Sequence, residues 1–411
     1  MNAPTGHRAD VTGAVARFAQ QLAQPETPSP DEPWMAQSLG KGAPGVALLH
    51  IERAHTGHGT WQQAHAWIAA AVASEISAAD TAGLYLGAPA IAFVLHAANA
   101  SSDARYRDAL KPVDAHVAAL AHRRTDAAMA RIQRGELSTF REYDLLYGLT
   151  GIGTYLLRSD PQGSALERIL DYLVALTRPL RADGRELPGW WVGHDPHFAV
   201  SPHFPGGHGN LGTAHGITGP LLLLSQAMRR GITVEGQHEA IEVICAWLGA
   251  WRQDGDSGPW WPEHVTLAGH RTGRTRQTGP TRPSWCYDTP GIARAGQLAG
   301  IATDNLSRQR SFEYALHRCL TDPAQVALIT DDGLCHGRAG VLQTAWRAAR
   351  DAVTPILGEV LPHLVEALVH HAEPGTDHGF LEGNAGVALA LTTAAADAAP
   401  TSGWDTCLLI D

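Results

Sequence analysis

The chain has 411 residues, of which 44% are hydrophobic and only 18% are charged. Charge is scarce against the roughly 25% of an average soluble domain, so much of the chain must be interior. A net charge of −10, from 31 basic and 41 acidic residues, argues against nucleic acid as the main partner. The N-terminus has no secretory signal pattern, and no run of about 18 apolar residues occurs, so we expect a cytoplasmic protein without a transmembrane segment.

A short glycine unit recurs along the chain and opens each predicted buried helix. It has the form small-x-x-small, usually Gly-x-x-Gly, and an apolar, alanine-rich segment follows each copy. In chain order the seven copies are residues 42–45, 87–90, 148–151, 216–219, 288–291, 337–340 and 383–386. The shortest spacing between copies, 45 residues, holds two helices and their turns.

The predicted helices are of two kinds, which suggests two layers. The segment after each glycine unit is apolar on all sides, as in a buried helix, whereas segments such as 166–180 and 239–253 are amphipathic. We expect the helix pairs to close into a ring because the inner helices have no polar face. An open solenoid of helix pairs is the alternative.

Three spacings between units are longer than the rest and predict additional loops. These loops lie near 123–142, 187–210 and 252–282, and the last has four arginines among its final dozen residues. We expect them to form cleft walls or partner contacts. Plain solvated loops are the alternative.

The cysteines favour reduced thiols or a metal site over a disulfide framework, because their number is odd and no signal peptide is visible. Cys286 and Cys335 each lie two residues before the first residue of a glycine unit, and His336 follows Cys335 directly. Equivalent loops of consecutive repeats are neighbours, so these three side chains can share one metal ion. Two cysteines and one histidine with an open fourth position form a known catalytic zinc pattern. The alternative is that both cysteines are small buried hydrophobic residues. We interpret the remaining cysteines as packing residues: Cys245, Cys319 and Cys407.

Three strings carry a resemblance to a known family: NLGTAHGITGP, RPSWCYDTPGIARA and LCHGRAG. They resemble the signatures of lanthionine synthetase C-like proteins, the class I lanthipeptide cyclases. PGWW at 188–191, YDLLYGLTGIGTYLL at 143–157 and the final SGWDTCLLID also fit. The resemblance spans residues 38 to 411 and implies an all-α fold, a single α/α toroid domain over 1–411 with seven inner and seven outer helices.

The resemblance also implies a cofactor, a substrate and partners. Cys286, Cys335 and His336 are expected to bind one zinc ion. The substrate would be a dehydrated precursor peptide, leader plus core, whose cysteine thiolates add to dehydroalanine or dehydrobutyrine to form lanthionine or methyllanthionine. A dehydratase and an exporter are possible partners, and association with them could bring the protein to a membrane.

Five further residues match the family's pattern around the metal. His215 is the expected proton donor or base, and Asp144 is expected to orient it. Arg282 is expected to hold the enolate oxygen or a carboxylate, and Trp285 and Tyr287 to line the substrate groove. The alternatives are an N-cap role for Asp144, a surface salt bridge for Arg282 and core packing for the two aromatic residues.

One residue departs from the family's pattern. Asp288 stands where the family usually has glycine after SWCY, and an aspartate tolerates a positive φ better than most residues do. We expect a tolerated substitution. Three other functions compete with a cyclase: a zinc-stabilised module that presents peptide to a dehydratase, an enzyme adding glutathione-type thiols to dehydrated proteins, and a toroidal glycosidase. The glycosidase would need paired carboxylates at the positions that hold Cys and His here.

Overall fold

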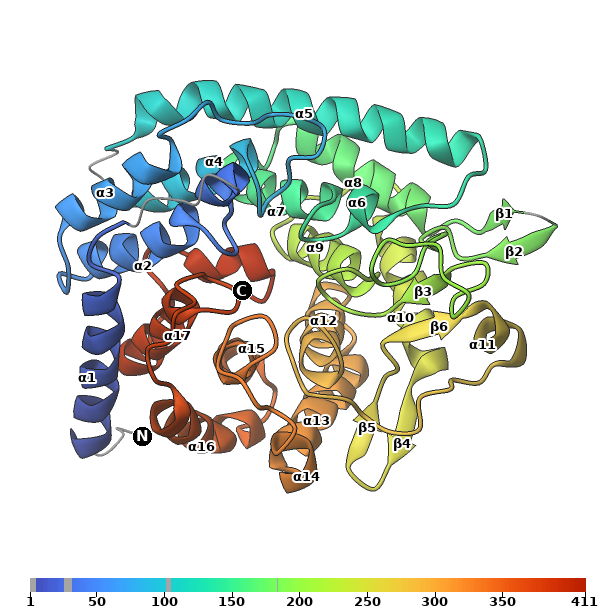
Figure 1. The fold of residues 1–411 in the computed structure, drawn as a ribbon. Helices are drawn as coiled ribbons and strands as arrows, with labels where there is room; N and C mark the ends of the chain where they lie inside the picture. Colours follow the sequence, from blue (N-terminus) through green and yellow to red (C-terminus); the bar gives the residue numbers. More distant parts are fainter. Residues whose placement is uncertain (1–4, 26–31, 101–104, 183) are drawn as a thin grey trace.

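The computed structural model describes residues 5–25, 32–100, 105–182 and 184–411. Its main helices form two concentric rings (Figure 1). The inner helices are α2 (Ala43–His55), α4 (Ala88–Ala98), α7 (Leu149–Ser159), α9 (Thr218–Arg229), α12 (Thr289–Ala302), α15 (Arg338–Asp351) and α17 (Asn384–Ala396). The outer helices are α1 (Thr5–Gln21), α3 (Trp61–Ala71), α5 (Arg107–Gln133), α8 (Ser164–Leu176), α10 (Gln237–Trp251), α13 (Leu306–Thr321) and α16 (Ile356–His371).

The inner helices begin at the glycine units because the backbone folds back on itself there. Six of them have the first residue of a unit as N-cap, and α9 begins one residue later, after Ile217. The fourth residue of the unit is glycine in six copies. A Cβ atom there would lie 1.9 to 2.8 Å from the carbonyl oxygen six residues earlier, a contact that only glycine permits. The glycines therefore bring each loop onto the first turn of its own helix.

The ring is closed by contacts between the two ends of the chain. Each inner helix contacts the next around the circle, and the last, α17, contacts the first, α2. Six outer helices pack on the inner helix that precedes them, whereas α1 packs on α17. The predicted toroid is thus confirmed and the open solenoid is excluded. Along the chain each inner helix is followed by its outer partner, except that the last inner helix, α17, pairs with the N-terminal helix α1.

The two layers bury their side chains as predicted. Ten of the eleven residues of α4 are buried, whereas three of the sixteen residues of the outer helix α16 are. Cys245, Cys319 and Cys407 are buried, as expected for packing residues. No helix within the described ranges has the length and apolar character needed to cross a bilayer.

Two of the three predicted loops carry the short strands. Residues 187–210 and 252–282 include parts of three two-stranded antiparallel sheets at one side of the ring (Figure 1). The pairs are β1 (Leu180–Ala182) with β2 (Arg185–Leu187), β3 (His208–Asn210) with β6 (His264–Thr266), and β4 (Gln253–Gly255) with β5 (Gly258–Trp260). The short elements that remain are η1 (Pro33–Gln37), α6 (Phe140–Tyr143), α11 (Leu267–Thr272), α14 (Pro323–Val326) and η2 (Trp404–Leu408).

The predicted loop at 123–142 is wrong over most of its length. Residues 123–133 continue α5, and 140–143 form α6. Thr125, Ala128 and Arg131 are buried at a spacing of three residues, so one face of this polar segment packs inward. The many charged residues lie on the other faces of a long outer helix.

The C-terminal segment occupies the centre of the ring (Figure 1). Arg294 on α12 is fully buried, and its Nε donates to the carbonyl oxygen of Ile410 at 2.9 Å. Arg347 on α15 pairs with the buried Asp405 at 2.7 Å. The inner helices thus fix this segment through the buried Arg294 and the partly buried Arg347.

Candidate functional site

The loops before the inner helices are joined by backbone hydrogen bonds from one repeat to the next. In the last four copies the residue two places before the glycine unit donates these bonds. The Cys286 N–H donates to Cys335 O at 3.2 Å, and the Cys335 N–H donates to Leu381 O at 2.8 Å. In the same way the N–H of Leu381 donates to Gly40 O, and that of Ala214 to Cys286 O. The equivalent positions therefore form a chain at one face of the toroid, which is why Cys286 and Cys335 are neighbours despite 49 intervening peptide bonds.

Cys286, Cys335 and His336 form a group that could hold a metal ion. One ligand atom from each of the three lies within 4.8 Å of the others. Cys286 is buried, and the other two are partly exposed. A tetrahedral zinc ion with Zn–S bonds of about 2.3 Å holds two sulfurs about 3.8 Å apart, so the donor set fits one ion after a small contraction. Thiolate and imidazole are the ligands that zinc prefers.

The electrostatics of the group favour a thiolate at Cys286. A hydrogen bond from the Cys335 thiol lowers the pKa of Cys286 to about 5, against the opposing effect of burial, and His336 adds to the lowering. The same interaction with Cys286 raises the pKa of Cys335. Interaction with Cys286 also raises the pKa of His336. Without a cation, two adjacent thiols share one proton; a dication would favour loss of both.

His215 and Asp144 form a hydrogen-bonded pair in the neighbouring loops. The His215 Nδ1 lies 2.6 Å from the Asp144 Oδ2, and Asp144 is fully buried. The loop of His215 is joined to the metal group by the Thr213 N–H, which donates to Cys286 O at 2.8 Å. Because the carboxylate accepts the Nδ1 proton, the neutral imidazole has a lone pair on Nε2, where it can take or deliver a proton.

The surroundings fix the His215 ring and the Asp144 carboxylate. His215 is stacked between Phe140 and Tyr147, with ring centroids 5.4 and 5.6 Å away. The second oxygen of Asp144, Oδ1, accepts the N–H groups of Tyr147 at 2.6 Å and Gly148 at 2.8 Å. Gly148, not Asp144, is the N-cap of α7. Asp144 therefore binds both the loop amides and the imidazole, so its structural role coexists with an orienting role.

A cavity of about 360 Å³ opens beside the metal group. Its lining includes Cys286, Tyr287 and Arg282, together with Glu263 from the 252–282 loop. Tyr287 is partly exposed, and its hydroxyl accepts a hydrogen bond from Asn210 Nδ2 at 2.8 Å. The cavity gives a second molecule access to Cys286. His215 and Asp144 are not among its lining residues, and the loop of His215 is the one that is hydrogen-bonded to Cys286 O.

Arg282 lines this cavity and makes a salt bridge as well. Its Nη1 lies 2.9 Å from Asp331 Oδ2, and the same carboxylate oxygen is 3.9 Å from His336 Nε2. Arg282 keeps 39% of its side chain exposed. Asp331 thus links the guanidinium to the imidazole of the metal group, which a solvated surface ion pair would not do.

Asp288 occupies the backbone conformation that explains the glycine usual at this position. Its φ is 63°, and it is almost fully buried. Its carboxylate accepts the N–H groups of Thr281 at 2.5 Å and Thr289 at 2.6 Å. Burial raises the pKa of Asp288 to about 6. These hydrogen bonds offset the cost of a positive φ in a residue with a Cβ.

Trp285 does not line the cavity. It is fully buried, and its indole N–H donates to Leu408 O at 3.0 Å. The side chain next to Cys286 therefore holds the C-terminal segment in place. A side chain without exposed surface has no face for a substrate, so we exclude Trp285 from the candidate site and retain Tyr287.

The sequence analysis missed Asp331 and Asn210. Both lie six residues before the first glycine of a unit, and Asp377 holds the same place in the last unit. The side-chain oxygen of each accepts the N–H two residues later. The signal was present as a shared pattern, Asn/Asp-x-Gly-x-x-x-Gly-x-x-Gly, in three of the seven copies.

Fold and site together define an α/α toroid whose loops gather two cysteines and two histidines at one face. Residues 33–409 match the family described as "Lanthionine synthetase C-like protein". The chain therefore belongs to the lanthionine synthetase C-like family.

Two individual proteins are similar to this chain. The nisin biosynthesis protein NisC of Lactococcus lactis subsp. lactis is 24% identical over 325 residues, which cover 76% of this chain and 73% of that protein. The solved structure of nisin cyclase superimposes with a TM-score of 0.81 at 21% identity, covering 99% of this chain and 98% of that one. This likeness agrees with the toroidal fold.

Proposed function

We propose that this chain is a zinc-dependent lanthipeptide cyclase that closes thioether rings in a dehydrated precursor peptide. The observation that carries the proposal is the convergence of Cys286, Cys335 and His336 on one point at the edge of a cavity. Membership of the lanthionine synthetase C-like family and the similarity to a nisin biosynthesis protein support it.

Cys286, Cys335 and His336 would hold one zinc ion per chain. When bound, zinc would lower the pKa of a peptide cysteine at its fourth position while leaving the sulfur nucleophilic. The peptide thiolate adds to the β-carbon of dehydroalanine or dehydrobutyrine, so that a carbon–sulfur bond forms. The alkene π electrons move to the neighbouring carbonyl as an enolate, and the α-carbon then takes a proton. The thiol proton is thus returned to carbon, and the net addition needs no oxidant.

His215 moves the proton in this scheme. The Asp144 carboxylate accepts a hydrogen bond from Nδ1–H, so this proton stays on His215 Nδ1. Nε2 then accepts a proton from the incoming thiol or delivers one to the enolate carbon. The stacking of Phe140 and Tyr147 restricts rotation of the ring. General acid–base catalysis of this kind contributes about 10²- to 10⁴-fold in rate.

Arg282 and Tyr287 would contact the peptide in the cavity. The Arg282 guanidinium is held by Asp331 and still has exposed donors, which suit the developing enolate oxygen. The Tyr287 ring forms part of the cavity wall. Because the proposed substrate is a precursor peptide, we also propose a dehydratase and an exporter as partners of this chain.

The test compares wild type with Cys286→Ala and His215→Ala on one dehydrated peptide. Ring closure leaves the peptide mass unchanged, so thiol alkylation followed by mass spectrometry counts the cysteines that have not reacted. We expect wild type to remove free thiols, Cys286→Ala to lose zinc and turnover, and His215→Ala to keep zinc but lose turnover. Equal thiol loss in all three, or none with wild type, would contradict the cyclase. Peptide binding without thiol loss would instead favour a module that presents peptide to a dehydratase.

A further inference from the structure

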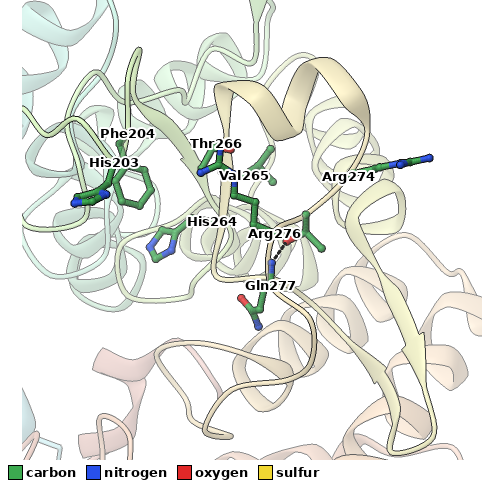
Figure 2. A pocket seen from close by; sticks show the side chains of 9 residues that line it. His203, Phe204, His264, Val265, Thr266, Arg274, Arg276 and Gln277 are labelled. Atoms are coloured by element: carbon green, nitrogen blue, oxygen red, sulfur yellow. Dashed lines mark hydrogen bonds between the residues drawn. The ribbon is translucent and has the colours of Figure 1, made fainter.

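A second cavity is lined by strand β6, which begins one residue after Glu263 of the first cavity. It has a volume of about 250 Å³ and is enclosed by β6 and the loop that follows α11 (Figure 2). Glu263 lines the first cavity and His264, the next residue, lines the second. Adjacent Cα atoms are about 3.8 Å apart, so the walls of the two cavities meet at residues 263 and 264.

The second cavity is lined by donor groups and has no acidic residue in its lining. Arg274, Arg276, His203 and His264 contribute to it. In Figure 2 His203 and His264 lie on one side and Arg274 points outward on the other. In the part of the chain that the structure describes, no carboxylate forms an ion pair with Arg274 or Arg276.

Buried polar groups at the same place lack partners. The Nε2 atom of His264 is buried without a hydrogen-bond partner among the described residues, and so is that of His208, whose ring centroid is 5.0 Å away. Buried polar atoms are nearly always satisfied, so the unpaired Nε2 of His264, a residue of the cavity wall, is a candidate partner for a polar occupant.

We propose that this second cavity binds a carboxylate side chain of the peptide substrate, in an extended segment flanking the residues that react. Arg276 supplies the charge and the planar donors that recognise a carboxylate, and His264 supplies a further polar contact. The inference rests on the proposed function for its occupant, a peptide. The proposed subsite requires an acidic residue in the peptide substrate for tight binding.

The test uses binding, so that it does not depend on ring closure. Two fluorescent peptides in which serine replaces every cysteine would carry either one Glu or one Gln in the flanking segment. Their affinity for wild type, Arg276→Glu and Arg271→Glu would be measured by anisotropy. Arg271→Glu is the matched control, because Arg271 is an exposed arginine of the same segment outside the cavity lining.

We expect wild type and Arg271→Glu to prefer the Glu peptide by about tenfold at low salt, and Arg276→Glu to lose that preference. A Lys peptide should regain affinity for Arg276→Glu. Equal affinity of wild type for the Glu and Gln peptides, or equal effects of the two substitutions, would overturn the subsite. Loss of binding to phosphatidylglycerol vesicles in Arg276→Glu, with peptide affinity unchanged, would assign the arginines to a membrane surface and overturn it too.

The same peptides with their cysteines restored and dehydrated separate the two proposals. Ring closure by wild type without a difference between the Glu and Gln peptides leaves the cyclase standing and removes the subsite. Glutamate-dependent binding without ring closure removes the cyclase and supports the subsite.

Discussion

Replacing Asp144 by asparagine should reverse the polarity of the hydrogen bond that orients His215. The two oxygens of Asp144 have different partners: Oδ1 accepts two backbone N–H groups, and Oδ2 faces His215 Nδ1 at 2.6 Å. In Asp144→Asn the amide oxygen must stay with the two N–H groups, because both are donors. The amide NH₂ then points at Nδ1, and the neutral imidazole has to carry its proton on Nε2.

The expected cost falls on rate far more than on stability. Loss of the correct tautomer should remove about 10²- to 10⁴-fold in turnover, or about 3–5 kcal/mol, since each tenfold is about 1.4 kcal/mol. The backbone hydrogen bonds survive, so the free energy of unfolding should fall by no more than about 1.5–3 kcal/mol, which is the contribution of one charge-assisted hydrogen bond. Asp144→Ala should differ, because it leaves two buried N–H groups unpaired at about 1–3 kcal/mol each.

The assay is the initial rate of thiol loss from a dehydrated peptide, with zinc content and urea unfolding measured on the same samples. Glu52→Gln is the matched control. Glu52 is a buried carboxylate that accepts the N–H groups of Thr401 and Ser402 at 3.0 and 2.8 Å, and no histidine among the described residues is bonded to it. We expect Glu52→Gln to lower stability and leave turnover per folded molecule unchanged. If Asp144→Asn retained the wild-type rate, the orienting role of Asp144 would be refuted.

Three other substitutions test separate parts of the site. Asp288→Gly should keep zinc and turnover, because glycine relieves the positive φ of 63° while losing the N-cap hydrogen bond from Thr289 N–H, each worth about 1 kcal/mol; complete loss of zinc would contradict a tolerated substitution. Asp331→Asn should keep zinc but raise KM, since it weakens the 2.9 Å salt bridge to Arg282; an unchanged KM in steady-state kinetics would argue against this positioning role. Burial lowers the pKa of His208 to about 4 from 6.5, so the unfolded chain binds a proton that the folded chain excludes. This difference contributes about 3 kcal/mol to the free energy of unfolding above pH 6.5, and the contribution is lost as pH falls toward 4. His208→Asn should therefore flatten the dependence of stability on pH between these values, as measured by urea unfolding. An unaltered slope would contradict this prediction.

The repeat frame made much of the fold and the metal group predictable. Glycine at the fourth position of a unit reflects a contact with a backbone carbonyl that leaves no room for a Cβ, so the start of six of the seven inner helices can be predicted from the sequence. Cys286 and Cys335 share a frame position that is hydrogen-bonded to its equivalent in the next loop, so alignment of the units was enough to bring them together.

Features outside the frame could not be predicted in the same way. Trp285 is buried by Leu408, which lies 123 residues further along the chain at the ring centre, and no local pattern reports such a contact. The length of α5 was missed because its polar residues mask the buried positions 125, 128 and 131. Asp331 could not be predicted from the cysteine motif because it lies four residues before Cys335, although Asn210 and Asp377 mark the same place in other units.

X-ray absorption at the zinc edge tests the central claim most directly. The zinc-loaded protein should give two sulfur and one imidazole nitrogen ligands with one exchangeable oxygen, from Cys286, Cys335, His336 and water. Addition of a cysteine-containing peptide should replace the oxygen by a third sulfur. A protein that binds no zinc, or a zinc ion with four protein ligands that does not change when peptide thiol is added, would contradict the account.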